Sequence, residues 1–246
     1  MSPSFDAAAY GEAVAAVYDR LHPHKGDVEA EYLSVLADGG RALELGIGTG
    51  RVALELVARG VDVHGIEASP AMVAELRKKP GGAAIPVTVG DFERLEAVPG
   101  GPFTLVYCPF NTFFQLADQD AQVRCFAGAA AQLAIGGAFL IDVFVPDPSR
   151  YARNQTFETF AIWHDEVVLH AAQHDPITQT VESRFVFAGG RPRPSVPLHI
   201  RYAWPSELDL MARLAGLELA ERYENYLAAP FLATSQYHIS IYRKWR

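Results

Sequence analysis

The chain is poor in cysteine and has no long apolar run. Only Cys108 and Cys125 occur among its 246 residues, one in a predicted strand and one in a predicted helix. We therefore expect two buried, reduced thiols, as suits the cytoplasm, and no disulfide framework. No stretch of about 20 consecutive apolar residues is present that could span a membrane. The first residues lack a basic segment followed by an apolar one, so we expect no signal peptide.

The chain also has fewer basic than acidic residues. The chain carries 21 Lys and Arg against 29 Asp and Glu, a net charge of −8. Binding a nucleic-acid backbone requires clustered cations, so we expect neither a nucleic-acid nor a membrane partner. Metal ligands are equally sparse: His170 and His174 would share a strand face, but no third ligand accompanies them. We find no carboxylate cluster suited to Mg²⁺, and we expect no metal cofactor.

The most informative feature is an apolar strand that runs directly into three glycines. Residues 43–50 read Leu-Glu-Leu-Gly-Ile-Gly-Thr-Gly. Glycines at this spacing let a ligand approach the backbone closely and permit turns with positive φ. Residues 51–59 follow with helical apolar spacing and no breaker. A strand, a glycine turn and a helix N-terminus together predict a nucleotide-type binding loop.

Two interpretations of this loop compete. Read from Gly48, the pattern is G-x-G-x-x-A, the dinucleotide fingerprint in its Ala-ended form. Read from Glu44, it is E-x-G-x-G-x-G, which resembles the loop of class I S-adenosylmethionine-dependent methyltransferases. An acid that binds ribose hydroxyls is expected at the end of the second strand in either case. Glu67 supplies it at the end of residues 61–67, so it does not choose between the two.

The residues downstream distinguish the two interpretations of the glycine loop and favour the second. A third predicted strand, 85–92, ends in Gly-Asp91-Phe92, and a fourth, 103–108, is followed by Pro-Phe-Asn-Thr. A helix over 119–133 and a strand over 136–144 come next. This order of landmarks across residues 41–145 resembles the class I methyltransferases. The resemblance implies that Asp91 takes the adenine amine and that Phe92 packs on the adenine ring.

The resemblance also implies a set of residues around S-adenosylmethionine. Glu44 contacts the methionine ammonium through water or orders the glycine loop. Arg51 pairs with the methionine carboxylate, or else it is a solvated arginine on the helix surface. The cofactor-binding set is Tyr18, Glu44, Gly46, Gly48, Gly50, Arg51, Glu67, Ala68, Asp91, Phe92 and Asn111.

Tyr18 belongs to a Tyr-Asp pair, which in the family caps the methionine carboxylate or touches the substrate. Tyr10 lies eight residues earlier on the same helix face and is a weaker candidate. The alternative is that both are core residues of a helical cap.

Candidates for acceptor contacts follow the fourth strand and the β-rich segment. Asn111 would lie at the carboxyl edge of the sheet, where open α/β folds bind ligands, although a turn-stabilising role is the alternative. His199 and Arg201 share one face of a predicted strand by two-residue alternation, and a structural role is their alternative. The predicted catalytic residues are therefore Asn111, Tyr18, His199 and Arg201.

We predict an α/β fold with a Rossmann-like seven-stranded methyltransferase sheet. Two helices, Asp6–Leu21 and Gly26–Ala37, form an N-terminal helical cap within residues 1–38, and residues 39–147 form the cofactor-binding core. Residues 148–203 form an antiparallel β insertion, which serves as a lid or as a dimerisation sheet. Its predicted strands are Glu158–Phe160, Glu166–His174, Thr178–Phe187 and Leu198–Ala203. Residues 204–246 supply a helix and the closing strands Leu217–Glu224 and Tyr237–Tyr242.

Within the superfamily, the segments beginning at Asn111 and Ser206 are similar to bacterial natural-product N-methyltransferases. The resemblance is to the cypemycin peptide amino-terminal type and, more distantly, to the nucleotide-aminosugar N,N-dimethyltransferases. It implies methyl transfer to a small molecule or peptide, with an amine nitrogen favoured. An O-methyltransferase, a nicotinamide- or flavin-dependent oxidoreductase and a non-methylating protein that has kept the fold remain alternatives. A homodimer is a further option.

Overall fold

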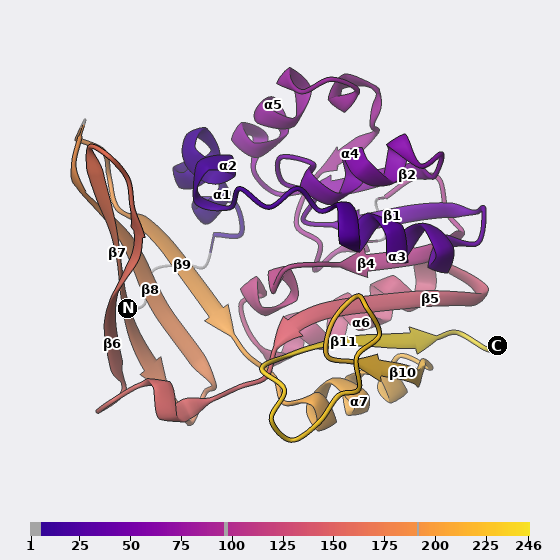
Figure 1. Ribbon diagram of the computed structural model, residues 1–246. Coiled ribbons are helices and arrows are strands. Elements are labelled where there is room, and N and C mark those ends of the chain that lie inside the picture. Colours follow the sequence, from indigo (N-terminus) through magenta and orange to yellow (C-terminus); the bar gives the residue numbers. More distant parts are fainter. Residues whose placement is uncertain (1–5, 96–97, 191) are drawn as a thin grey trace.

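The computed structural model of the protein describes residues 6–95, 98–190 and 192–246, and it contains two separate sheets (Figure 1). The larger sheet has seven strands in the order β10-β11-β5-β4-β1-β2-β3. Strands β5, β4, β1, β2 and β3 run parallel, whereas β11 is antiparallel to both β5 and β10. The strands are β1 Arg41–Leu45, β2 Asp62–Glu67, β3 Val87–Val89, β4 Phe103–Cys108, β5 Leu133–Phe144, β10 Glu218–Tyr223 and β11 Tyr237–Arg243. The predicted seven-stranded α/β fold is confirmed.

Helices cover both faces of this sheet, as the near-continuous apolar runs of its central strands require. Helices α3 (Asp27–Ala37), α4 (Arg51–Ala58) and α5 (Pro70–Lys78) lie on one face (Figure 1). Helices α6 (Gln119–Gln132) and α7 (Pro205–Leu214) lie on the other. Two apolar layers result, because each face of the sheet buries its side chains against its own helices.

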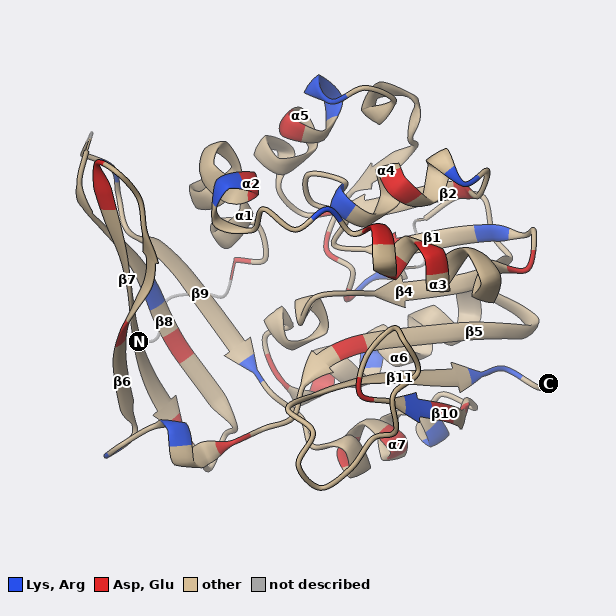
Figure 2. Cartoon of the chain, in the orientation of Figure 1, with Lys and Arg blue, Asp and Glu red and all other residues tan. Residues whose placement is uncertain are grey.

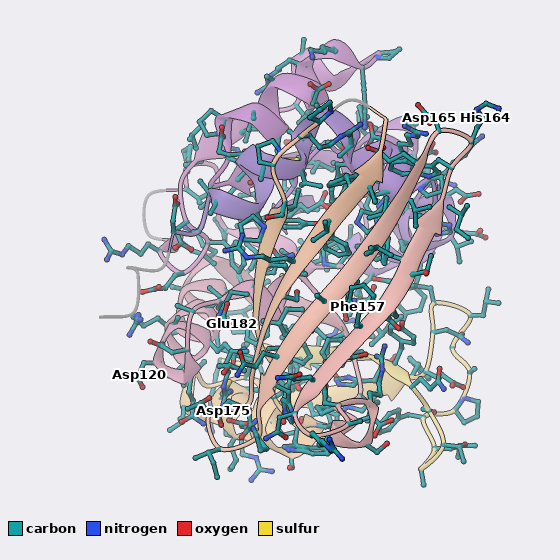
Figure 3. All side chains as sticks on the ribbon, turned by 90° about the vertical axis from the view of Figure 1, so that its left-hand side faces the viewer. Asp120, Phe157, His164, Asp165, Asp175 and Glu182 are labelled. Carbon is teal, nitrogen blue, oxygen red and sulfur yellow. The ribbon has the colours of Figure 1, made fainter. Side chains whose placement is uncertain are left out.

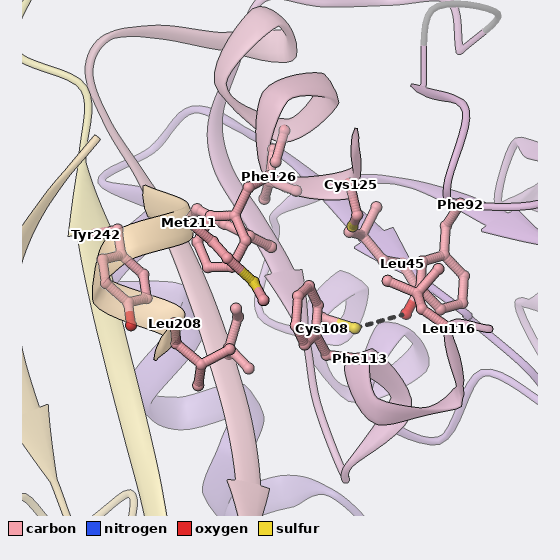
Figure 4. Packing of buried hydrophobic residues seen from close by; sticks show 14 of the residues in the cluster. Leu45, Phe92, Cys108, Phe113, Leu116, Cys125, Phe126, Leu208, Met211 and Tyr242 are labelled. Carbon is pink, nitrogen blue, oxygen red and sulfur yellow. Dashed lines mark hydrogen bonds between the residues drawn. The ribbon is translucent and has the colours of Figure 1, made fainter. Parts of the chain in front are cut away.

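Both cysteines lie in one of these layers, among Phe113, Phe126 and Met211 (Figure 4). Cys108 and Cys125 are fully buried and free, which confirms the predicted buried thiols. The Cys108 thiol donates a hydrogen bond of 3.8 Å to the Leu45 carbonyl. Burial raises the pKa of both thiols well above the usual range, so they remain protonated.

The N-terminal segment differs from the single helix predicted over residues 6–21. It consists of α1 (Ala9–Val14), a 3₁₀ turn (Ala15–Val17) and α2 (Tyr18–Leu21). The β-branched residues Val14 and Val17 take φ values of −103° and −126° at the two breaks. Val14 and Leu21 both belong to an apolar cluster that includes Phe185 and Val196 of the smaller sheet. The second predicted helix is confirmed as α3.

The smaller sheet is the predicted antiparallel insertion, with strand order β6-β7-β8-β9. Its strands are β6 Gln155–Ile162, β7 Glu166–Asp175, β8 Thr180–Gly189 and β9 Val196–Arg201. Its inner face packs on α1 and α2 through Phe185 and Val196. Figure 3 shows Phe157 and Glu182 on the outer face, where Phe157 is 70% exposed.

Two predicted boundaries are corrected. The third strand is only Val87–Val89 rather than 85–92, because Pro86 has no N–H to donate and the chain turns at Gly90. The fifth strand begins earlier than the predicted residue 136, at Leu133, which pairs with Phe103.

Charged residues of both signs are interspersed over the helices and strands of the described chain (Figure 2). None of the helices in the described ranges is long and apolar enough to cross a membrane.

Candidate active site

The glycine loop between β1 and α4 is built in the left-handed backbone region. Gly46, Gly48 and Gly50 have φ values of 69°, 55° and 77°. A Cβ atom on Gly46 would collide with the Thr112 side chain, and one on Gly50 would collide with Leu76. Glycine is therefore required at these positions both for the turn and for the close packing of the loop.

A cavity opens beside this loop at the carboxyl edge of the parallel strands. The N-terminal cap closes it from one side and the loop after β4 from another. This is the edge where open α/β sheets bind their ligands. Its lining residues are Ala7, Tyr10, Gly11, Tyr18, Glu44, Gly46, Ile47, Gly48, Thr49, Arg51, Val52, Glu67, Ala68, Met72, Phe92, Pro109, Phe110, Thr112 and Gln115.

Glu67, the last residue of β2, reaches this cavity and is 9% exposed. One carboxylate oxygen accepts a hydrogen bond from the Gly48 N–H and the other accepts one from the Ser69 N–H, each at 2.9 Å. Burial raises the pKa of Glu67, and these backbone donors oppose the shift. The carboxylate is thus fixed in place while its remaining lone pairs are available to hydroxyl donors on a ligand.

Glu44 lies on β1, in the cavity wall, and is 3% exposed. It accepts a hydrogen bond of 2.8 Å from the Tyr107 hydroxyl. Burial raises the pKa of Glu44 to about 8, although the Tyr107 bond and the positive charge of Arg51 act in the opposite direction. Burial therefore favours the neutral form of this carboxyl group, and a cation bound next to it would favour the charged form.

Arg51, the first residue of α4, carries an unsatisfied donor. Its guanidinium carbon lies 4.1 Å from the centroid of the Phe110 ring. Its Nη1 atom is buried and has no hydrogen-bond partner among the described residues. A buried guanidinium donor without a partner is costly, and a ligand carboxylate in the cavity would satisfy it.

Two carboxylates attach the N-terminal cap to the core. Glu12 on α1 accepts hydrogen bonds from the Ser69 hydroxyl at 2.7 Å and from the Ala71 N–H at 3.0 Å. Asp19 on α2 accepts one from the Thr49 hydroxyl at 2.7 Å and pairs with Lys79 at 2.7 Å. The cap is therefore held against both the glycine loop and α5.

These contacts place Tyr10 and Tyr18 together in the cavity wall. Burial is the main cause that raises the pKa of both hydroxyls, for Tyr18 to about 12, so both are protonated at neutral pH. Each can donate a hydrogen bond to a ligand.

The loop after β4 is held in an uncommon backbone conformation. Phe110 and Asn111 have φ values of 59° and 63°, a left-handed geometry that is rare for a bulky residue such as Phe110. Asp142 on β5 supports both residues, because its carboxylate accepts from the Phe110 N–H at 3.1 Å and its carbonyl accepts from the Asn111 N–H at 2.9 Å. The Asn111 side-chain oxygen accepts from the Phe144 N–H at 2.7 Å. Strained backbone that is fixed at several points is typical of functional sites.

The structure brings most of the predicted cofactor residues into one wall. Tyr18, Glu44, Gly46, Gly48, Arg51, Glu67, Ala68 and Phe92 all line the cavity. Three predicted residues lie just outside its lining. Gly50 is the N-terminal cap residue of α4, and the Asp91 carboxylate accepts a hydrogen bond from the Glu93 N–H at 2.9 Å. The Asn111 side chain bonds to the Phe144 N–H on β5, a long-range contact rather than the local turn contact that was its alternative interpretation.

The two catalytic candidates on β9 do not line the cavity. Arg201 donates to Gln122 and to Glu207, each at 2.6 Å, and so ties β9 to α6 and α7. His199 contacts Glu182 and, at 3.0 Å, the Ala117 carbonyl. A catalytic role for His199 and Arg201 stays a prediction, and these contacts favour the structural alternative.

Sequence reasoning missed several wall residues. Pro109, Phe110 and Thr112 lie beside Asn111 in the segment after the fourth strand, but nothing in the sequence indicated which of them faces the cavity. Gly11 and Met72 carried no signal at all. Gly11 is needed because a Cβ atom there would meet the Ser69 side chain where α1 crosses α5.

No group of three or more His, Cys, Asp or Glu side chains suited to a metal ion occurs within residues 6–95, 98–190 and 192–246.

Comparison with known proteins identifies the relatives of this chain. Residues 42–137 match a family described as a methyltransferase domain. The chain is 37% identical to the CcbJ methyltransferase from Streptomyces caelestis, covering 98% of this chain and 100% of that one, with a TM-score of 0.91. It is 29% identical to a cypemycin N-terminal methyltransferase from Streptomyces sp, over 94% of this chain and 96% of that protein. CalS10, an amino pentose methyltransferase from Micromonospora echinaspora, shares the fold at 22% identity with a TM-score of 0.68, over 94% of this chain and 96% of that one.

Proposed function

The chain belongs to the class I S-adenosylmethionine-dependent methyltransferases, and from this premise we propose that it methylates an amine nitrogen of a small molecule or peptide. Two relatives support the acceptor. One is named for methylating the N-terminus of cypemycin, and another is the sugar N-methyltransferase KedS8, which at 23% identity shares the fold. A cytoplasmic location, the absence of nucleic-acid and membrane partners, and a homodimer stay predictions.

The residues of the cavity wall fit S-adenosylmethionine. Glu67 would accept hydrogen bonds from the ribose hydroxyls, and Phe92 would pack on the adenine. At the other end, Arg51 would pair its free Nη1 donor with the methionine carboxylate, and Glu44 would face the methionine ammonium. Tyr18 would add a hydroxyl donor at the carboxylate or at the acceptor. When bound, this cofactor supplies a methyl group that its positively charged sulfur has already activated.

The chain then has to place the acceptor in line with that methyl group and exclude water. Positioning alone can lower such a barrier by about 7–11 kcal/mol. The cap, held by Glu12 and Asp19, and the loop supported by Asp142 provide rigid walls for this purpose.

One observation supports an amine rather than an alcohol as the acceptor. Among the described residues that line the cavity there is no histidine, and the two carboxyl groups present, Glu44 and Glu67, are engaged by Tyr107 and by backbone N–H groups. An alcohol needs a general base to become nucleophilic, whereas a neutral amine already has a free lone pair. A wall without a free base, next to a His22 imidazole whose pKa burial lowers to about 4, therefore favours nitrogen over oxygen.

Matched pairs of acceptors test this proposal. The protein is incubated with S-adenosylmethionine carrying a deuterated methyl group and with one member of each pair. The pairs are cyclohexylamine and cyclohexanol, benzylamine and benzyl alcohol, and an alanine-initiated peptide and its N-acetylated form. Mass spectrometry should show the labelled methyl group on amines only. Labelling of the alcohols alone would contradict the proposal and identify an O-methyltransferase. Cofactor binding without labelling of any acceptor, peptides included, would favour the non-methylating alternative.

A further inference from the structure

His22 is the meeting point of three aromatic side chains from different parts of the chain. It is the C-terminal cap residue of α2, and its backbone N–H donates to the Tyr18 carbonyl at 2.9 Å. Its ring centroid lies 4.8 Å from that of Tyr18, 5.2 Å from that of Phe110 and 6.0 Å from that of Phe160. The cap, the loop after β4 and the inner face of the smaller sheet therefore converge on one imidazole.

This cluster adjoins the cofactor cavity and is partly open. Tyr18 and Phe110 line the cavity, whereas His22 and Phe160 are not among its lining residues but contact these two rings directly or through His22. Phe110 is 37% exposed and Phe160 is 40% exposed, although both contact other rings. Two half-exposed phenyl rings beside a buried cavity form an apolar surface on which a ligand can pack.

We propose that His22, Phe110 and Phe160 form the acceptor-binding face, an inference that rests on the proposed function. This face binds a primary or secondary amine carried by an apolar group. The His22 imidazole accepts a hydrogen bond from the amine N–H, and the two phenyl rings contact the apolar group. The hydrogen bond orients the nitrogen lone pair, so His22 acts as an acceptor-orienting residue.

The hydrogen bonding of His22 supports this role. Neither ring nitrogen has a hydrogen-bond partner among the described residues, so a lone pair is available. Burial, together with the positive charge of Arg51, lowers the pKa of His22 to about 4, so the ring is neutral at physiological pH. Asp19 acts on His22 in the opposite direction and does not overcome these causes. A neutral imidazole can accept a hydrogen bond from N–H but is too weak a base to deprotonate an alcohol.

The same surroundings act on the acceptor. A bound amine next to His22 would experience the same desolvation and the same cationic neighbour, and both favour its neutral form. The neutral amine forms the new N–C bond with its lone pair, and the C–S bond breaks with both electrons remaining on sulfur. The methylated nitrogen then carries a positive charge and loses one proton to water.

The first test observes His22 in the wild-type protein saturated with S-adenosylhomocysteine. Histidine ring carbons are labelled with ¹³C, and the His22 resonance is identified by its loss in His22→Phe or His22→Gln. Benzylamine should shift this resonance at lower concentration than ethanolamine does, and it should leave the exposed His164 resonance unmoved. A His22 resonance that benzylamine does not shift, in a protein that binds S-adenosylhomocysteine, would overturn the inference and leave the proposed function standing.

The second test separates orientation from packing. With the most active amine as acceptor, His22→Phe should lower kcat/KM at least 10-fold and change the Kd of S-adenosylhomocysteine less than 2-fold. His22→Gln, which keeps an acceptor atom, should recover part of the loss. His24→Phe is the matched control, because His24 lies on the same segment but contacts Glu29 instead. Equal loss of cofactor affinity and turnover, without rescue by Gln, would show a purely structural role. Failure of the wild type to bind S-adenosylhomocysteine would instead refute the proposed function.

Discussion

Replacing Glu67 with glutamine is the most informative perturbation of the cofactor site. Both oxygens of this carboxylate already accept backbone hydrogen bonds, one from Gly48 and one from Ser69. The same oxygens are proposed to accept from the ribose hydroxyls. Glutamine keeps the shape of the side chain but turns one acceptor oxygen into an NH₂ donor. Wherever that NH₂ points, one acceptor site at the ribose is lost and an N–H donor faces another donor.

The magnitude follows from the kind of bond that is lost. A hydrogen bond to a charged acceptor contributes about 1.5–3 kcal/mol. The Kd of S-adenosylhomocysteine should therefore rise about 10- to 150-fold in Glu67→Gln. Stability should change less than binding does. Burial raises the pKa of Glu67 and so penalises its charged form, which glutamine relieves, while the unpaired backbone donor acts in the opposite direction.

Isothermal titration calorimetry with S-adenosylhomocysteine measures the affinity, and thermal unfolding without ligand measures the stability. Glu75→Gln on the surface of α5 is the matched control, because Glu75 pairs with the exposed Lys78 and does not line the cavity. The control should bind like the wild type. An unchanged Kd in Glu67→Gln would refute the assignment of the β2 acid to the ribose.

Three further perturbations test other parts of the site. Because the pKa of Glu44 rises from its ordinary 4.5 to about 8 on folding, the folded protein retains a proton that the unfolded chain has released, so stability should fall as pH rises from about 4.5 to 8. Glu44→Gln should flatten this profile in thermal unfolding and exceed the wild-type Tm at pH 8.5 while binding cofactor more weakly; an unaltered profile would contradict the assigned burial. The double change Tyr10→Phe with Tyr18→Phe should lower turnover at least 10-fold and move Tm by only a few degrees. Large losses of both turnover and Tm would instead indicate that the two tyrosines are core residues of the cap. Asp142→Ala should release Phe110 from its left-handed conformation and raise the KM for the acceptor several-fold more than the Kd for cofactor, as steady-state kinetics and calorimetry would show; a change confined to cofactor binding would argue against this support role.

The glycine loop and the position of Glu67 were predictable because each belongs to a local strand–turn unit, whereas Phe92 was placed by the resemblance to the family. The requirement for positive φ at Gly46, Gly48 and Gly50 depends on neighbouring backbone, and Glu67 ends a strand whose end is visible in the sequence. Such features need no knowledge of the tertiary contacts.

The walls that close the cavity could not be predicted in the same way. The left-handed backbone of Phe110 depends on Asp142, which is 32 residues away. Two-residue alternation placed His199 and Arg201 on one face of the strand. It could not show that the Arg201 guanidinium would donate its hydrogen bonds to Gln122 and Glu207. Val14, where the first helix ends, likewise packs in one cluster with residues of the smaller sheet, which lies far along the chain. Tertiary contacts, rather than local propensity, decide these positions.

The central claim is that the cavity beside the glycine loop binds S-adenosylmethionine. A thermal-shift panel with S-adenosylmethionine, S-adenosylhomocysteine, NAD(P) and FAD tests it most directly. A ligand at 100 times its Kd adds about 2.7 kcal/mol, which raises the Tm of a chain of this length by about 5–10 °C. We predict this shift with the two sulfur compounds alone. A shift with a dinucleotide and none with the sulfur compounds would contradict the account.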